Sequence, residues 1–167
     1  MISLKKRDQG FTIVELLIVI VVIGILALLV ITTYAGIQSK ARNSKRQTDL
    51  KSLQTQIEAF FSQNGYYPSN TDLNSASWRT TNMKSLDANA LVDPSSTSST
   101  CSGSTQTTCL ADNNTGQAKQ YSYYPQDSSG SSSNCETTDT TCSQYTLIAN
   151  YEGTVNGNTQ DKLNNLD

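Results

Sequence analysis

The longest hydrophobic segment of the chain is an apolar run from Phe11 to Ile31, in which Glu15 is the only charged residue. As an α-helix with a rise of about 1.5 Å per residue, the run would be about 31 Å long, which matches a hydrocarbon core of about 30 Å. It is therefore predicted to be a transmembrane helix. Basic residues stand just before it, in Lys5-Lys6-Arg7, and this predicts a cytoplasmic N-terminus and an exported C-terminus.

No strong helix breaker follows the apolar run. Residues 32–62 contain no proline, and their apolar positions recur at steps of three and four, which draws one stripe on a helix: Leu50, Leu53, Ile57 and Phe60. The pattern predicts one continuous helix from about Phe11 to about Gln63, apolar all round over 11–31 and amphipathic over 32–63. It should end at Asn64-Gly65, and its apolar stripe must pack on the rest of the chain.

The remaining residues, 64–167, are predicted to form an exported globular region. Residues 87–92 are expected to form a short helical turn. Alternating patterns predict strands over Gln120–Tyr124 and Gln144–Glu152, and the Asn156-Gly157 pair predicts a tight hairpin turn after the second strand. The predicted fold class is therefore α+β: a long N-terminal α-helix packed on a small C-terminal antiparallel β-sheet with disulfide-closed loops.

The four cysteines lie in Ser/Thr-rich sequence that is expected to form loops, including residues 95–118. An even number of cysteines in loop-rich sequence after a membrane segment predicts disulfides in an oxidising compartment. The local pairs Cys101–Cys109 and Cys135–Cys142 are favoured, because short loops cost the least entropy to close. A zinc site of four thiolates is the alternative, and the absence of C-x-x-C spacing disfavours it.

Composition narrows the function classes. The chain has no histidine, no glycine-rich phosphate loop and no paired acids in apolar surroundings, so no enzyme activity, metal or cofactor is predicted. Net charge is −2, with most of the acids after Gly65, which suits a solvated exterior. The bases between Lys40 and Lys51 fall on several faces of a helix. A solvated face is favoured for them, and nucleic acid as a partner has no further support.

The start of the chain carries the most specific motif. Gly10-Phe11-Thr12-Ile13-Val14-Glu15, followed by Leu16-Leu17-Ile18-Val19-Ile20, closely resembles the N-terminal signature of type IV pilins and pseudopilins. The resemblance implies that residues 1–10 are a leader, which a membrane-embedded prepilin peptidase removes between Gly10 and Phe11. It also implies methylation of the new Phe11 amine. That amine can pair with Glu15 of a neighbouring subunit, because a carboxylate at membrane depth is costly without a partner.

The resemblance predicts a structural subunit, with a major pilin favoured, of a type IV pilus-like filament that supports adhesion or twitching motility. Its partners would be other subunits in a helical homopolymer, the peptidase, the assembly platform with its ATPase, and the membrane before assembly. A minor pilin or pseudopilin of a secretion or DNA-uptake system is one alternative. A monomeric, signal-anchored adhesin or receptor is another. An ordinary secretory signal peptide is disfavoured, since its apolar core is typically about 7–15 residues.

Overall fold

The computed structural model describes residues 10–96, 109–130, 135 and 142–166. The predicted leader residues 1–9 and Cys101 lie outside the described residues. The chain divides into two compact units, Met1–Gln38 and Ser39–Asp167, and each is considered by itself. The second is called the head unit below. Its elements after the first helix are α2 (Asn70–Asn74), α3 (Ala76–Asn82), the 3₁₀-helix η1 (Ala88–Leu91), β1 (Leu110–Ala111), β2 (Tyr121–Gln126), β3 (Gln144–Val155) and β4 (Asn158–Asn164).

Helix α1 runs without a break from Ile13 to Asn64, 52 residues, which confirms the predicted continuous helix. The helix ends at Asn64, as the Asn64-Gly65 pair predicted. Gly65 has a φ of +80°, in the left-handed region that glycine adopts without steric cost, and its N–H donates to the carbonyl of Phe61 at 2.7 Å. This bond occupies one of the carbonyls that a helix end leaves without a partner.

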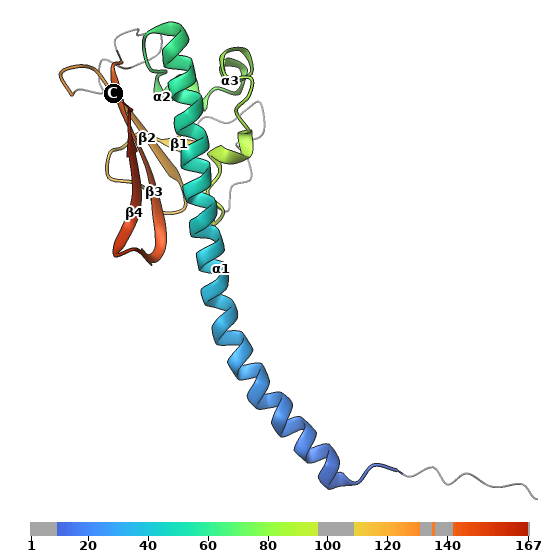
Figure 1. The fold of residues 1–167 in the computed structure, drawn as a ribbon. Coiled ribbons are helices and arrows are strands. Elements are labelled where there is room, and N and C mark those ends of the chain that lie inside the picture. The colour runs from blue at the N-terminus through green and yellow to red at the C-terminus, as the bar shows by residue number, and fades with distance from the viewer. Residues whose placement is uncertain (1–9, 97–108, 131–134, 136–141, 167) are drawn as a thin grey trace, which may run out of the picture. The chain divides into compact units, whose positions relative to one another are not determined.

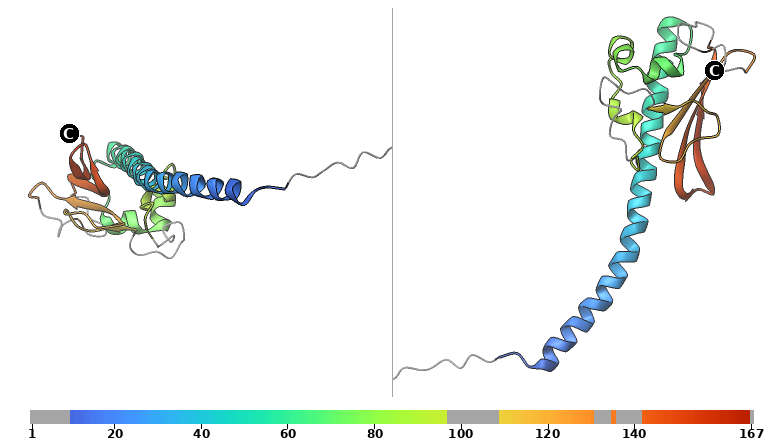
Figure 2. Two further views of the ribbon diagram at one scale, coloured as in Figure 1. Left: turned by 90° about the horizontal axis from the view of Figure 1, so that it is seen from below. Right: turned by 180° about the vertical axis from the view of Figure 1, so that it is seen from behind.

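The predicted apolar stripe of α1 forms the middle of the head core. Leu50, Leu53 and Ile57 are completely buried, and Phe60 is nearly so. They pack with buried residues of the sheet and of the segment after α1, among them Tyr67, Leu73, Tyr121, Tyr123, Tyr145 and Leu147. Figures 1 and 2 show the sheet on one side of this half of α1, with α3 and η1 on the other.

The sheet has the strand order β1-β2-β3-β4. Strands β2, β3 and β4 pair antiparallel, as predicted, but the short β1 pairs parallel to β2, so the sheet is mixed. For the residues of β1 the sequence predicted a loop. The side chain of Asn74 fixes the strand: its Oδ1 accepts from the N–H groups of Cys109 and Leu110 at 2.6 and 2.8 Å, and its Nδ2 donates to the Leu110 carbonyl at 3.0 Å. The Asn74 side chain, from α2, thus holds Cys109 and Leu110 in position, and β1 forms there beside β2.

The predicted hairpin turn joins β3 to β4. Asn156 and Gly157 have φ values of 51° and 83°. Two successive residues with positive φ define the type I′ turn, whose twist matches that of a hairpin. The short helical turn expected over residues 87–92 is also present, as η1. Helices α2 and α3 were not predicted; the hydroxyls of Ser69 and Ser75 cap them by accepting from the N–H groups of Asp72 and Trp78.

Candidate functional site

The predicted site begins at the N-terminal end of α1. Thr12 and Glu15 form a capping box there, in which each side chain accepts from the other residue's backbone. The Thr12 N–H donates to Glu15 Oε2 at 2.8 Å, and the Glu15 N–H donates to Thr12 Oγ1 at 3.2 Å. The Thr12 hydroxyl also donates to Glu15 Oε2, at 2.7 Å. The Glu15 carboxylate therefore turns back toward the peptide that follows Phe11. The T-x-x-E spacing is a readable capping signal, but it did not enter the sequence prediction.

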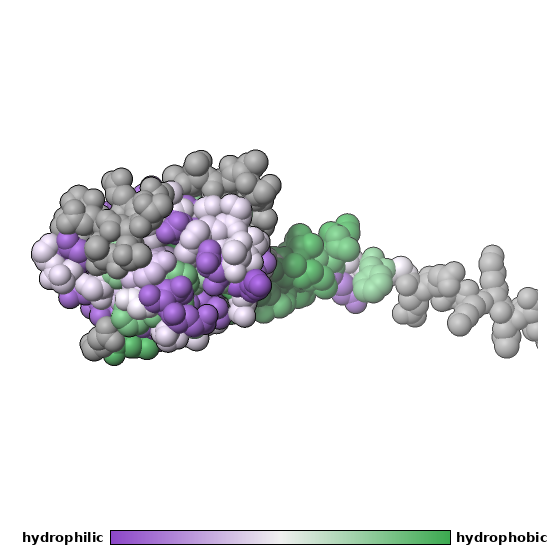
Figure 3. Space-filling model, turned by 90° about the horizontal axis from the view of Figure 1, so that it is seen from above, coloured by the Kyte–Doolittle hydropathy of each residue, from purple (hydrophilic) through white to green (hydrophobic). Residues whose placement is uncertain are grey.

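The apolar residues around this box are exposed within the chain. Phe11 is 89% exposed and Ile13 85%, and the apolar side chains described from Val14 to Ile31 are about half exposed or more. Figure 3 shows this segment as a mainly hydrophobic surface with a hydrophilic interruption near its end, whereas the visible face of the head unit is mainly hydrophilic. By length and composition, α1 is sufficient to span a membrane. Apolar area of this extent must be covered by lipid or by other chains, since a soluble monomer rarely exposes it.

Polar residues of α1 bind the sheet on either side of the buried stripe. The Tyr121 hydroxyl donates to Asp49 at 2.8 Å, and the Tyr145 hydroxyl donates to Glu58 at 2.7 Å. Glu58 also accepts from the hydroxyl of Tyr67 at 3.1 Å. Burial, reinforced by these hydrogen bonds to carboxylates, raises the pKa of Tyr121 and of Tyr145 far above the usual tyrosine range. The phenols stay neutral and act as donors.

Two of the bases between Lys40 and Lys51 do not form a solvated face. Arg46 is 1% exposed and donates to both oxygens of the buried Asp93, from Nε at 2.7 Å and from Nη2 at 2.9 Å. Arg42 donates from Nε and Nη2 to Glu152, which also accepts from Arg46 at 3.0 Å and from the Ser95 hydroxyl at 2.5 Å.

These contacts shift the pKa values of Glu152 and Arg46, which with Arg42, Asp93 and Ser95 form one polar cluster. The hydrogen bonds from Arg42, above all, lower the pKa of Glu152 well below the ordinary carboxylate range. Burial by itself would lower the pKa of Arg46, but the hydrogen bonds to Asp93 and Glu152 raise it above its usual value. Arg46 and Glu152 therefore stay charged across the physiological pH range. The cluster attaches α1 to β3 and to the segment after η1.

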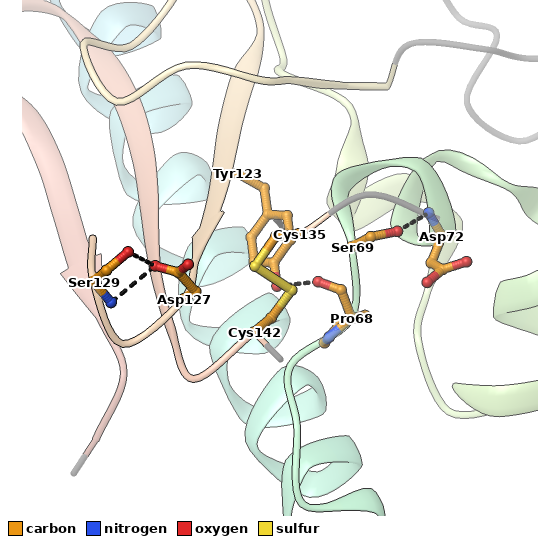
Figure 4. Close-up of a disulfide and its surroundings, with 8 residues drawn as sticks. All are labelled: Pro68, Ser69, Asp72, Tyr123, Asp127, Ser129, Cys135 and Cys142. Carbon is orange, nitrogen blue, oxygen red and sulfur yellow. Dashed lines mark hydrogen bonds between the residues drawn. A yellow bond between two sulfur atoms is a disulfide. The ribbon is translucent and has the colours of Figure 1, made fainter. Parts of the chain in front are cut away.

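The second predicted cysteine pair is confirmed. Cys135 and Cys142 are bonded, with their Cα atoms 5.4 Å apart. Figure 4 shows the bond beside the ring of Tyr123, whose hydroxyl donates to the Pro68 carbonyl at 2.7 Å. Cys109 is also in a disulfide, but Cys101 lies outside the described residues, so the pair Cys101–Cys109 stays a prediction. A zinc site of four thiolates is wrong, since disulfide sulfurs are not thiolates.

Comparison with known proteins gives a family match at the N-terminal end and partial similarity to several proteins. Residues 5–31 match the family model described as the prokaryotic N-terminal methylation motif. The chain is 41% identical over 63 residues to the type IV major pilin protein PilA of Myxococcus xanthus, which covers 38% of this chain and 29% of that protein. It is 35% identical over 65 residues to the type II secretion system core protein G of Dickeya chrysanthemi, which covers 39% and 42%.

Core protein G of Aeromonas hydrophila gives a similar result, with 38% identity over 64 residues, 38% of this chain and 45% of that protein. The chain is thus aligned with less than half the length of these relatives. No solved structure matches the chain.

Proposed function

We propose that the chain is a structural subunit of a type IV pilus-like surface filament, because residues 5–31 match the prokaryotic N-terminal methylation motif and the chain is similar to a type IV major pilin and to a type II secretion system core protein. The observation that carries the proposal is the exposed apolar part of α1, residues 13–31, which has a single carboxylate, Glu15, near its start. Such a surface fits a membrane before assembly and neighbouring helices of the same kind afterwards. A major pilin that supports adhesion or twitching motility is the favoured form.

Processing follows from the chemistry of the first residues. We place the leader at residues 1–10 and its cleavage by a prepilin peptidase between Gly10 and Phe11. Gly10 has no side chain, so its backbone can enter a narrow protease site in an extended conformation. Cleavage leaves the apolar segment 11–31 in the mature chain and creates an amine at Phe11, which keeps its charge when methylated.

Assembly uses the charge that cleavage creates. In the capping box the Glu15 carboxylate accepts hydrogen bonds from Thr12, but these donors are neutral. The amine of a neighbouring subunit's Phe11 would supply the missing positive charge in surroundings of low dielectric, where pairing matters most. Pairing between subunits fixes the axial register of one helix against the next, and it favours the filament over the membrane-embedded monomer.

The remaining parts follow from this arrangement. Residues 11–31 form the transmembrane helix and later the filament core, 32–63 continue as the amphipathic helix, and 64–167 form the exported globular region. The N-terminus faces the cytoplasm before assembly. The partners are further copies of the chain, the peptidase, and an assembly platform with its ATPase. The similar proteins are a type IV major pilin and a type II secretion system core protein.

The experiment is to shear filaments from cells and to determine the N-terminal peptide by mass spectrometry. We expect a peptide that begins at Phe11 and carries one methyl group on its amine. In Gly10→Leu the precursor should stay uncut in the membrane. In Glu15→Gln the chain should be cut but absent from the sheared fraction. Asp87→Asn, which removes one exposed carboxylate of the head unit and keeps a good helix cap, is the matched control and should assemble normally.

Two results would contradict the proposal. A chain that stays with the membrane and begins at Met1 would be an anchored monomeric adhesin or receptor. Normal filament yield and register in Glu15→Gln would refute the pairing between subunits, though not the filament itself.

The similarity to core protein G supports a second candidate, a pseudopilin of a secretion system. Deletion of the gene separates the two candidates. Loss of abundant surface filaments together with motility or adhesion indicates a pilin, whereas loss of secreted proteins with unchanged surface filaments indicates a pseudopilin.

A further inference from the structure

The head unit contains a cleft that the filament function does not use. Its volume is about 550 Å³, and its walls come from α1, the segment after η1, the turn before β2, and β3. Three of its lining residues are cations and one is an anion: Arg42, Arg46, Lys119 and Glu152. The rest of the lining is partly polar and partly apolar: Ser95, Asn150, Pro94, Ala118 and Tyr151. Two of these segments, α1 and the turn before β2, bring the positive charge, and β3 brings the anion Glu152.

Two of the three cations already have carboxylate partners. Arg46 pairs with Asp93 behind the cleft wall, and its Nη1 donates to Asn43 at 2.7 Å, so all three of its nitrogens are engaged. Arg42 binds Glu152 through Nε and Nη2, which leaves its Nη1 for a ligand. Lys119 forms no ion pair with any carboxylate that the structure describes. The excess charge of the cleft is therefore its ammonium.

The backbone of Lys119 is the second observation. Among the described residues other than glycine, only Lys119 and Asn156 have positive φ, at 60° and 51°. Asn156 belongs to the Asn-Gly hairpin turn, where this conformation is required. Lys119 lies in the turn enclosed by the Gln117–Gln120 bridge, where glycine would adopt the same φ with less strain. A residue held in a sparsely populated conformation is a marker of functional positions.

We propose that this cleft binds a phosphate monoester, with Lys119 and Arg42 as the two residues that contact the phosphate oxygens. A carboxylate fits best against the two-nitrogen fork of an arginine, but Arg42 has already given its fork to Glu152. What remains is a single guanidinium nitrogen and a mobile ammonium, which approach from different walls. The three oxygens of a tetrahedral phosphate accept from separate directions, and the ring of Tyr151 and Pro94 leave room for a compact organic group such as a sugar.

The test uses the full chain, labelled with ¹⁵N, in a maltoside detergent free of phosphate. Glucose 1-phosphate, glycerol 3-phosphate, inorganic phosphate and acetate are titrated separately up to about 20 mM, while the amide signals of Lys119 and Tyr151 are followed. We expect saturable shifts with the phosphate compounds. Stronger binding of glucose 1-phosphate indicates a sugar phosphate as the natural ligand, and stronger binding of glycerol 3-phosphate indicates a lipid headgroup.

Lys119→Gly is the decisive variant, because it removes the ammonium and keeps the left-handed turn. It should weaken phosphate binding about tenfold or more, whereas Lys84→Ala, at another exposed lysine of the head unit, should leave binding unchanged. The proposal is overturned by the absence of saturable shifts, by equal binding to the wild type and Lys119→Gly, or by acetate binding as tightly as phosphate. The last result would make the cleft a site for an acidic protein side chain.

Discussion

Replacement of Arg46 by methionine should destabilise the head unit strongly. Arg46 and Asp93 are both almost completely buried, with side chains only 2% and 1% exposed, and two hydrogen bonds join them. Methionine fills a similar volume but cannot donate. In the variant the Asp93 carboxylate keeps one donor at short range, the N–H of Ser95 at 2.7 Å, and has no buried cation beside it.

The expected loss of stability follows from a general property of buried ion pairs: removing one partner costs far more than replacing both. Removal of one partner leaves an uncompensated buried charge, which lowers the free energy of unfolding by about 3–5 kcal/mol. For a domain of this size each kcal/mol corresponds to about 3–5 °C in melting temperature. The melting temperature of Arg46→Met should therefore fall by roughly 10–20 °C. The double variant Arg46→Met/Asp93→Asn carries no buried charge at this place and should recover at least half of the loss.

The chain supplies its own probe for this measurement. Trp78 is the only tryptophan, and its ring lies 5.1 Å from that of Phe60 in the head core. Its fluorescence reports unfolding of the head unit without interference from the apolar segment of α1. Thermal melts of the full chain in detergent, recorded for wild type, both single variants and the double variant, give the coupling between Arg46 and Asp93.

Lys51→Met is the matched control, five positions later on the same helix. Lys51 is exposed and donates from Nζ to the neutral Gln54 Oε1 at 3.1 Å, so its replacement takes no cation away from a buried carboxylate. If Arg46→Met melts as close to the wild type as Lys51→Met does, the reasoning is refuted, because the buried pair would then contribute no more than a surface lysine.

Two further predictions concern the sheet. Burial raises the pKa of three tyrosines of β2 and β3: Tyr121, Tyr123 and Tyr145. As the pH rises, these tyrosines therefore lose their protons in the unfolded chain before they do so in the folded chain. The free energy of unfolding should fall above about pH 10, by up to about 1.4 kcal/mol per pH unit for each tyrosine. A flat Trp78 melting temperature between about pH 9 and 11 would contradict this. Gly116→Ala should cost about 2–4 kcal/mol, because the new Cβ would lie 2.6 Å from Asn150 Oδ1 in addition to the strain of a positive φ. Gly153→Ala, with a similar φ and open space around it, isolates the strain and should melt several degrees higher than Gly116→Ala.

The elements that sequence predicted are those whose signals are local. The periodic stripe of α1, its stop at Gly65 and the Asn-Gly hairpin each depend on residues within a few positions of one another. The parallel strand β1 was missed because its two residues carry no pattern of their own. It exists because Asn74, 36 positions away from Leu110, supplies the hydrogen bonds that hold it.

For Arg42 and Arg46 the prediction of a solvated face was wrong for the same reason, whereas Lys40, Lys45 and Lys51 are exposed. A helical projection shows that the bases of residues 40–51 point in several directions. It does not show that a buried carboxylate lies in one of those directions. Arg46 meets Asp93 across 47 positions, and Arg42 meets Glu152 across 110. Partners at such distances are set by how the head unit folds around α1, and no periodicity of α1 contains that information.

The acids of α1 show how this difference bears on function. The helix has three: Glu15, Asp49 and Glu58. Asp49 and Glu58 each accept hydrogen bonds from tyrosines of the sheet, far away in sequence. Glu15 lies on the exposed apolar half, and among the described residues only the neighbouring Thr12 contacts its carboxylate. In the head unit, the acids of α1 thus accept hydrogen bonds from distant residues of the same chain. In the apolar part of the helix, Glu15 has only neutral donors from a neighbouring residue among the described residues. Under the proposed function, the cationic partner of Glu15 would be the amine that cleavage creates at Phe11 of a neighbouring subunit, and assembly would then depend on processing.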